Sequence, residues 1–211
     1  MTLVALIDGP LAQDHPALMQ RIEVVPSAVE DSPAGRHAAA MAETILTAAA
    51  PTRFLSLPVF PGALSAKVTH LVRALEAAEE SAAPIVHCSL GLARDDPSVS
   101  KVVARLVASG RHVVAAAAAR GGPVWPAALP GVISVQGDAR CGAADWSLLD
   151  LSTARYGAAP RHPTDPAIAG ASVAAAQMTG LLAAMLADGE TDPERVLAER
   201  AAFRGRERRT G

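Results

Sequence analysis

Residues 84–117 read PIVHCSLGLARDDPSVSKVVARLVASGRHVVAAA, and this stretch indicates the architecture of the chain. The run 84–91 has the short apolar pattern of a buried strand. Residues 97–110 carry apolar side chains at helical spacing and end at Gly110, a residue that commonly terminates helices. The run 112–117 is again strand-like. A strand, a helix and a second strand in this order predict two parallel strands joined by a helical crossover.

The same alternation continues on both sides of this stretch. Further strand-like runs lie at residues 4–7, 54–60 and 131–137. Helical patterns lie at residues 35–49 and 172–189. A further helical pattern starts at Ser65, which we expect to be its N-cap, and a last one follows Asp192-Pro193. We therefore predict an α/β fold with a mostly parallel central sheet and helices on both faces.

The composition indicates a single globular domain without a nucleic-acid partner. The chain has 211 residues, of which 50% are apolar and 19% charged, with a net charge of −2. This length supports one well-buried core, and the slight negative charge argues against general affinity for nucleic acid. Cys88 and Cys141 have neither metal-ligand spacing nor the density of a disulfide scaffold. We expect no metal and no cofactor.

The chain ends give no sign of export or of a membrane anchor. Residues 1–10 run directly into a strand-like segment and lack a secretory signal pattern. The apolar stretch 170–187 is interrupted by Ser172, Gln177 and Thr179, which favours a buried helix over a membrane span. We expect a cytoplasmic protein, with no membrane partner, that has one domain over residues 1–203 and a basic tail over residues 204–211.

Three residues at the ends of predicted elements suggest nucleophilic catalysis. Asp8 follows the first strand, His37 lies near the start of the first long helix, and Ser172 begins the helix 172–189. A serine hydroxyl becomes a nucleophile when an imidazole takes its proton, and a carboxylate orients that imidazole. Taken alone, each residue is more often structural: an aspartate after a strand a turn or cap residue, a histidine before a helix a structural or surface residue, and the serine an N-cap. Their chain order of Asp, His and Ser is shared with one known type of triad.

The sequence around these residues resembles the subtilisin family of serine peptidases. Five blocks carry the resemblance in the family's order: VALIDGPLAQDHPALMQRI (4–22), HAAAMAETI (37–45), PIVHCSLG (84–91), VVAAAAARGGPVWPAALPGVISVQG (113–137) and GASVAAAQMTGLLAAML (170–186). The family has HGTHVAGTI, Asn-Met-Ser-Leu-Gly and GTSMAAPHVAGLAALL at the second, third and fifth blocks. Together the blocks extend over nearly the whole chain.

The resemblance implies both a fold and an activity. It implies a subtilisin-like three-layer fold reduced in size, with Asp8, His37 and Ser172 as the catalytic triad. It also implies that Ser89, Leu90 and Gly91 line the substrate groove. A substrate polypeptide would pair there as an extended strand with an exposed sheet edge.

One departure from the family concerns the oxyanion hole. The family's oxyanion asparagine falls on Ala119 in one register of the fourth block and on Arg120 in the other. An alanine side chain donates no hydrogen bond, whereas an arginine carries five donors. Losing this amide slows such an enzyme by about 10²–10³-fold without abolishing its activity. In the serine block, Ala176 and Gln177 also replace the family's Pro and His.

These features predict a slow, narrowly specific endopeptidase that removes a leader or pro-segment from one dedicated precursor. Small subtilisin-like peptidases without a pro-segment act in bacterial maturation of ribosomally made, modified peptides. On size alone, one candidate counterpart is the leader-trimming peptidase for the small subunit of quinohemoprotein amine dehydrogenase. The altered oxyanion position leaves open a catalytically inactive binding or scaffold module. A haloacid-dehalogenase-type phosphatase is disfavoured, because its nucleophilic aspartate would fall on Leu6.

Overall fold

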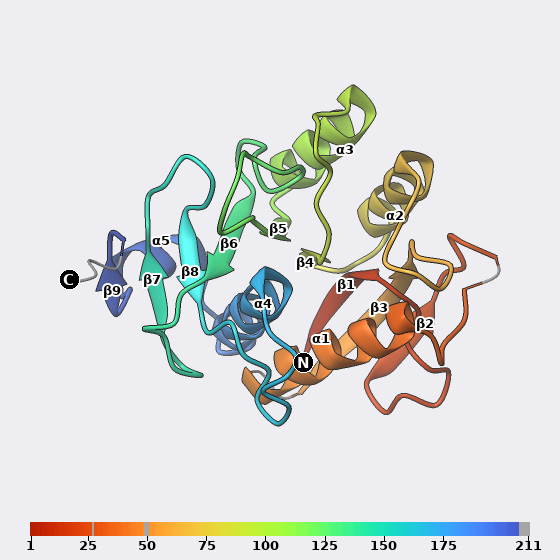
Figure 1. The fold of residues 1–211 in the computed structure, drawn as a ribbon, viewed down its shortest axis with the longest axis horizontal. Coiled ribbons are helices and arrows are strands. Elements are labelled where there is room, and N and C mark those ends of the chain that lie inside the picture. The colour runs from red at the N-terminus through yellow and green to blue at the C-terminus, as the bar shows by residue number, and fades with distance from the viewer. Residues whose placement is uncertain (27, 49–50, 207–211) are drawn as a thin grey trace.

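The computed structural model describes residues 1–26, 28–48 and 51–206, and it shows alternating strands and helices (Figure 1). The strands are β1 (Thr2–Asp8), β2 (Leu18–Arg21), β3 (Thr52–Pro58), β4 (Ile85–Cys88), β5 (His112–Ala116), β6 (Ile133–Gly137), β7 (Trp146–Leu148), β8 (Tyr156–Ala158) and β9 (Phe203–Arg204). The helices are α1 (Pro33–Ala48), α2 (Val68–Glu80), α3 (Pro97–Ala108), α4 (Ala171–Ala187) and α5 (Pro193–Glu199).

The described strands form one sheet in the order β2-β3-β1-β4-β5-β6-β8-β7-β9. All neighbouring pairs are parallel except β7 with β8. The chain winds from β1 out to β3 on one side and then crosses to β4 on the other, so the winding direction reverses between β1 and β4. Ligands of parallel sheets bind at the carboxyl ends of the strands near such a reversal. Asp8 is the last residue of β1 and Ser89 follows β4, so both lie at that edge.

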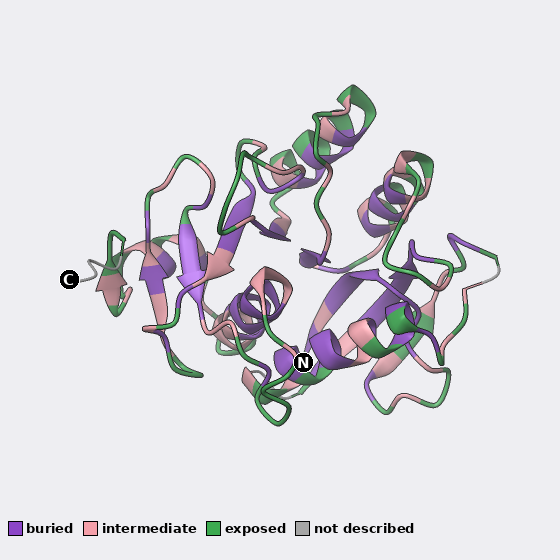
Figure 2. Ribbon diagram, in the orientation of Figure 1, coloured by how far each residue is buried: buried purple, intermediate pink, exposed green. Residues whose placement is uncertain are grey.

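Helices cover both faces of the sheet, as the sequence predicted. Alternate residues of β1 point to opposite faces, with Val4 and Leu6 in the core beneath α1 and α4 and with Ala5 and Ile7 in the core beneath α2 and α3. Figure 2 shows the central strands buried almost throughout, and helix surfaces exposed only on their outer sides. This burial on both faces explains why the central strands are apolar without alternation.

The starts of α1 and α2 differ from the prediction. The Ser32 hydroxyl accepts the N–H of Gly35 at 3.1 Å, so it caps α1, and Pro33 follows as the first helical residue. The prediction of Ser65 as the N-cap of α2 is wrong, because α2 begins at Val68 after an uncapped Lys67. Ser65 instead lies in the loop before the helix. Residues 171–187 form a helix with buried residues along most of its length, as expected for this apolar stretch.

The start of the basic tail is attached to the sheet. Phe203 and Arg204 pair with β7, and the Arg204 guanidinium donates to the carbonyl of Ala198 at 2.8 Å. Residues 207–211 of the predicted tail lie outside the described residues. None of the helices in the described ranges has the length and apolar character needed to span a bilayer.

Candidate active site

Asp8 and His37 are joined at the carboxyl end of β1. The Nδ1 of His37 lies 2.9 Å from each carboxylate oxygen of Asp8. The Gly9 N–H also donates to Asp8 Oδ1 at 2.7 Å. A carboxylate can only accept hydrogen bonds, so Nδ1 carries the proton and Nε2 is the free basic nitrogen of the neutral ring. Asp8 is fully buried, whereas the His37 side chain is 20% exposed and reaches solvent.

The surroundings of this pair change the pKa values of both Asp8 and His37. Burial lowers the pKa of His37, but the hydrogen bond to Asp8 and its negative charge outweigh that effect, so the pKa is raised from its ordinary value. Burial raises the pKa of Asp8, against the opposing effects of His37, Gly9 and Ser89. The neighbouring Cys88 thiol is also buried and close to the Asp8 charge, which raises its pKa to about 12. Cys88 therefore stays protonated and does not compete as a nucleophile.

Ser172 stands in the first turn of α4. Gly170 is the N-cap and has φ 141°, a conformation that favours glycine, and Ser172 is the second helical residue. Its backbone N–H belongs to the first turn, where amides have no partner within the helix. The Ser172 hydroxyl makes no hydrogen bond within the described part of the chain. It is thus free to approach a ligand or the His37 ring.

A cleft of about 360 Å³ brings the predicted residues together. It is lined by His37 and Ser172, by Ser89, Leu90 and Gly91 after β4, and by Phe60, Leu64, Ser65, Ala66 and Leu92. Leu64 is 55% exposed at this cleft. The candidate base, the candidate nucleophile and the predicted groove residues therefore share one opening. The lining adds apolar side chains for a peptide to contact.

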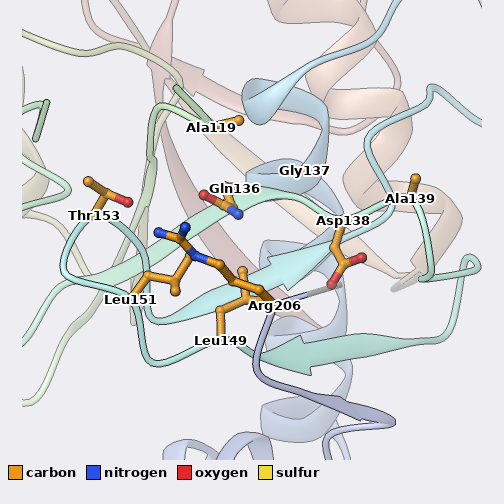
Figure 3. Close-up of a pocket in the computed structure, with 9 residues that line it drawn as sticks. All are labelled: Ala119, Gln136, Gly137, Asp138, Ala139, Leu149, Leu151, Thr153 and Arg206. Carbon is orange, nitrogen blue, oxygen red and sulfur yellow. The ribbon is translucent and has the colours of Figure 1, made fainter. Parts of the chain in front are cut away.

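The two candidate oxyanion residues lie apart from this lining. Ala119 lines a different cavity of about 350 Å³, together with Gln136, Asp138, Thr153 and others (Figure 3). Arg120 is exposed in the same loop, and its guanidinium has no partner among the described residues. Residues 119–123 are all exposed. The structure therefore does not fix a side-chain donor beside Ser172 at either position.

The helices that carry His37 and Ser172 pack directly against each other. A Cβ at Gly180 of α4 would lie 2.6 Å from Ala48 Cβ and 2.7 Å from the Ile45 carbonyl oxygen of α1. Only a glycine allows this close approach of the two backbones. The loop before Ser172 also approaches α1, where His162 Nε2 lies 3.4 Å from a carboxylate oxygen of Glu43. These contacts fix the histidine-bearing helix relative to the serine-bearing helix.

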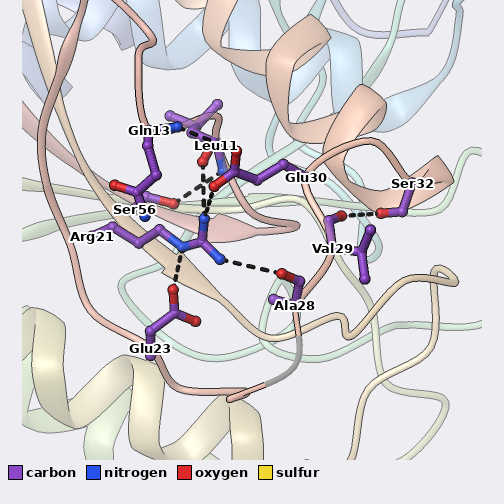
Figure 4. A network of polar contacts seen from close by, with 9 residues as sticks. All are labelled: Leu11, Gln13, Arg21, Glu23, Ala28, Val29, Glu30, Ser32 and Ser56. Atoms are coloured by element: carbon purple, nitrogen blue, oxygen red, sulfur yellow. Dashed lines mark hydrogen bonds and ion pairs between the residues drawn. The ribbon is translucent and has the colours of Figure 1, made fainter.

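The sequence analysis did not identify a buried arginine that supports two loops near the site. One loop follows Asp8, and the other leads into α1, the helix of His37. Arg21 of β2 forms an ion pair with Glu30, another with Glu23 at 2.6 Å, and donates to the carbonyls of Leu11 and Ala28 (Figure 4). Leu11 belongs to the loop after Asp8, and Glu30 to the segment that leads into α1. Paired charges at a fixed separation along the sequence could have suggested an ion pair, but not these carbonyl contacts.

Comparison with known proteins supports the fold. No protein-family model matches the sequence, and no curated protein matches it. Among solved structures, the chain is similar to the S218A mutant of the protease domain of PatA, with 20% identity, a TM-score of 0.66, and coverage of 92% of this chain and 81% of that one. The chain has the fold of a subtilisin-like protease domain.

Two further structures agree with this assignment. The prenylagaramide maturation protease PagA is 22% identical with a TM-score of 0.65, covering 92% of this chain and 78% of that one. The self-cleaved protease domain of PatA is 21% identical with a TM-score of 0.63, covering 92% and 82%. The predicted reduced subtilisin-like α/β fold is therefore confirmed. Within the described residues, no cluster of His, Cys, Asp or Glu has the arrangement of a metal site.

Proposed function

We propose that this chain is a serine endopeptidase with Asp8, His37 and Ser172 as its triad. The observation that carries the proposal is the Asp8–His37 hydrogen bond, at 2.9 Å, beside a cleft that Ser172 also lines. The fold shared with protease domains supports it. An Asp–His pair with a free Nε2 and a serine at a helix N-terminus together supply a base, its orienting carboxylate and a nucleophile.

Each residue has a defined task in the proposed reaction. His37 Nε2 takes the Ser172 proton as Oγ attacks the scissile carbonyl, and Asp8 stabilises the imidazolium that forms. The same proton then goes to the leaving amine, which releases the first product and leaves an acyl-serine. Water, deprotonated by His37, hydrolyses this ester and restores Ser172. The raised pKa of His37 favours the protonated intermediate state.

The oxyanion would depend chiefly on the backbone. The Ser172 N–H and the positive end of the α4 dipole would stabilise the negative charge that develops during attack. Ala119 adds no side-chain donor, and Arg120 supplies one only if its exposed side chain turns toward the cleft. Weak oxyanion stabilisation predicts slow turnover. Slow turnover is acceptable when a docked substrate supplies proximity.

The proposed substrate is a dedicated precursor polypeptide from which a leader or pro-segment is removed. PagA is described as a maturation protease, and a PatA protease domain as self-cleaved. Ser89, Leu90 and Gly91 line the cleft beside His37, where an extended peptide would pair with the chain. One candidate precursor is the small subunit of quinohemoprotein amine dehydrogenase. We further propose a cytoplasmic site of action and one catalytic domain over residues 1–203.

A fluorophosphonate probe tests the proposed triad without knowledge of the substrate. Ser172 Oγ would attack phosphorus and displace fluoride, while His37 takes the serine proton. We expect labelling of the wild type, located at Ser172 by peptide mass spectrometry. Ser172→Ala should show no labelling while keeping the wild-type circular dichroism spectrum. Labelling of Ser172→Ala to the same extent would contradict the proposal.

A catalytically inactive binding module is the second candidate function. The observation that favours it is the missing side-chain donor at Ala119, together with a Ser172 hydroxyl that has no partner in the described structure. Such a module would bind a peptide in the cleft and never react. Incubation of the wild type with the candidate precursor separates the two functions. Binding without either cleavage or labelling of Ser172 would favour the inactive module.

A further inference from the structure

A second histidine lies buried behind the proposed active site. His87 is in β4, paired in register with Leu6 of β1 and Val114 of β5, and it is 0% exposed. Strand alternation directs its ring to the face covered by α1 and α4, since Val86 and Cys88 belong to the opposite core. The hydrophobic core on that face includes Leu6 and Val114, the two residues paired with His87. A buried imidazole is costly there unless both of its nitrogens have partners.

Both nitrogens of His87 do have partners. Nδ1 lies 2.8 Å from the hydroxyl of Thr179, and Nε2 lies 2.9 Å from the hydroxyl of Ser89. Thr179 belongs to α4, two turns after Ser172, whereas Ser89 follows β4 and lines the catalytic cleft. The register of β4 beside β1, with Cys88 opposite Ile7, places Ser89 next to Asp8, and Ser89 opposes the rise in the pKa of that carboxyl. A single chain of polar contacts therefore runs from α4 to the carboxylate that orients His37.

The direction of these hydrogen bonds follows from the chemistry of their ends. Asp8 as a carboxylate only accepts, and Ser89 lowers its pKa, so the Ser89 hydroxyl turns its proton toward Asp8. The Ser89 oxygen then accepts from His87, which places the ring proton on Nε2. Nδ1 is left as an acceptor, and Thr179 donates to it. Burial, assisted by the nearby charge of His37, lowers the pKa of His87 to about 3, which keeps the ring neutral and in one tautomer.

We propose that His87 is a positioning residue that holds the Ser89 hydroxyl toward Asp8 and couples this contact to α4. The inference rests on the proposed peptidase function, because positioning Asp8 matters only if the His37 base is used. Without His87, the Ser89 hydroxyl is free to rotate away from Asp8. Asp8 then loses one of the groups that hold its carboxylate in line with His37.

Three variants at one position separate this role from simple packing. His87→Gln keeps a nitrogen near the place of Nε2, His87→Asn keeps one only near Nδ1, and His87→Leu keeps neither. We expect His87→Gln to react with the fluorophosphonate close to the wild-type rate. His87→Asn and His87→Leu should react about tenfold more slowly, as is typical for the loss of a hydrogen bond that serves a charged group. Equal rates for the Gln and Asn variants would overturn the proposal.

Val86→Ala is the matched control, since Val86 lies on the same strand and points into the opposite core. It should lower the thermal midpoint while leaving the labelling rate of the folded protein unchanged. A fall in its rate like that of His87→Leu would show that any damage to β4 slows the reaction. The proposal would then be wrong.

The wild-type protein offers a test that needs no variant to fold. In protein with ¹⁵N-labelled histidine, nuclear magnetic resonance should show one ring that stays neutral with the proton on Nε2 from about pH 5 to about pH 8. A proton on Nδ1 of that ring, or a charged ring, would overturn the inference. If Ser172 of the wild type is not labelled, the peptidase proposal itself fails. If Ser172 is labelled and all three His87 variants match the wild type, only the positioning role fails.

Discussion

The Asp8–His37 region and the loop over residues 118–125 are built in opposite ways. Asp8 is fully buried, bonded to His37 and Gly9, and supported from behind by Ser89 and the Arg21 ion pairs. Residues 119–123 of the loop are exposed, and a Cβ at Gly121 or Gly122 would meet no atom within 4 Å. The carboxylate that holds the candidate base His37 is therefore part of the folded core, whereas the predicted oxyanion position at residue 119 or 120 is not. A change at residue 119 or 120 should therefore cost little folding free energy, whereas a change around Asp8 should lower the stability of the fold as well as disturb the Asp8–His37 contact.

The largest expected effect is a gain of activity in the loop. Ala119→Asn should raise the rate of Ser172 labelling by about 10²-fold if residue 119 faces the oxyanion when substrate is bound and nothing replaces the family's amide. The melting temperature should stay within error of the wild type, because residue 119 is exposed. Labelling kinetics together with calorimetry measure both quantities.

Arg120→Ala is the companion variant for that experiment. If the arginine has taken over the oxyanion role, Arg120→Ala lowers the labelling rate and Ala119→Asn does not change it. That pair of results would contradict the backbone-dependent oxyanion site proposed above. It would also show that an exposed loop residue acts in the reaction without being fixed by the fold.

The contrast between the two regions explains what could be predicted from the sequence. Apolar runs such as residues 4–7 and 85–88 are buried on both faces of the sheet, so the pattern indicated the central strands and their parallel arrangement. The short strands β2, β7, β8 and β9 were missed, because two to four residues of mixed polarity carry no clear period. Ser65 was misassigned because propensity alone does not locate the helix start.

The site divides in the same way. Asp8, His37 and Ser172 follow from element ends and chain order, and the structure places His37 against Asp8 and in one cleft with Ser172. The contacts of His87 with Thr179 join residues 92 positions apart, which no local pattern encodes. The oxyanion position was left between Ala119 and Arg120 for a physical reason. An exposed loop has no packing constraint that would fix its register.

A second prediction compares two glycines, one from each region. A Cβ at Gly9 would lie 2.0 Å from the Ala34 carbonyl oxygen of α1, beside Asp8, whereas Gly122 has open space around it. Gly9→Ala should lower the free energy of unfolding by about 1–3 kcal/mol, as overpacking does, and should slow labelling because Asp8 and α1 are pushed apart. Gly122→Ala should change neither quantity measurably. Urea unfolding checks the first effect, and equal stability of the two variants would refute the contrast.

The smallest expected effect is a shift in the pH midpoint of Ser172 labelling, and it depends on the Asp8–His37 region alone. His37 acts as a base only when neutral, and its pKa is raised by Asp8 above the ordinary value of 6.5 despite the opposing effect of burial. The rate of Ser172 labelling should therefore fall as the pH is lowered, with a midpoint above 6.5. His87, with a pKa of about 3, stays neutral throughout this range and does not contribute. The midpoint belongs to the coupled Asp8–His37 pair rather than to either residue singly.

Two variants assign this midpoint to its source. Asp8→Asn removes the charge but keeps the burial, so the residual labelling should have its midpoint shifted to lower pH. Gly122→Ala in the loop should leave the midpoint where it is in the wild type. A wild-type midpoint at or below 6.5 would mean that burial outweighs Asp8. Asp8 would then not raise the pKa of His37 above its ordinary value, and the buried region would not differ from the loop in its effect on the base.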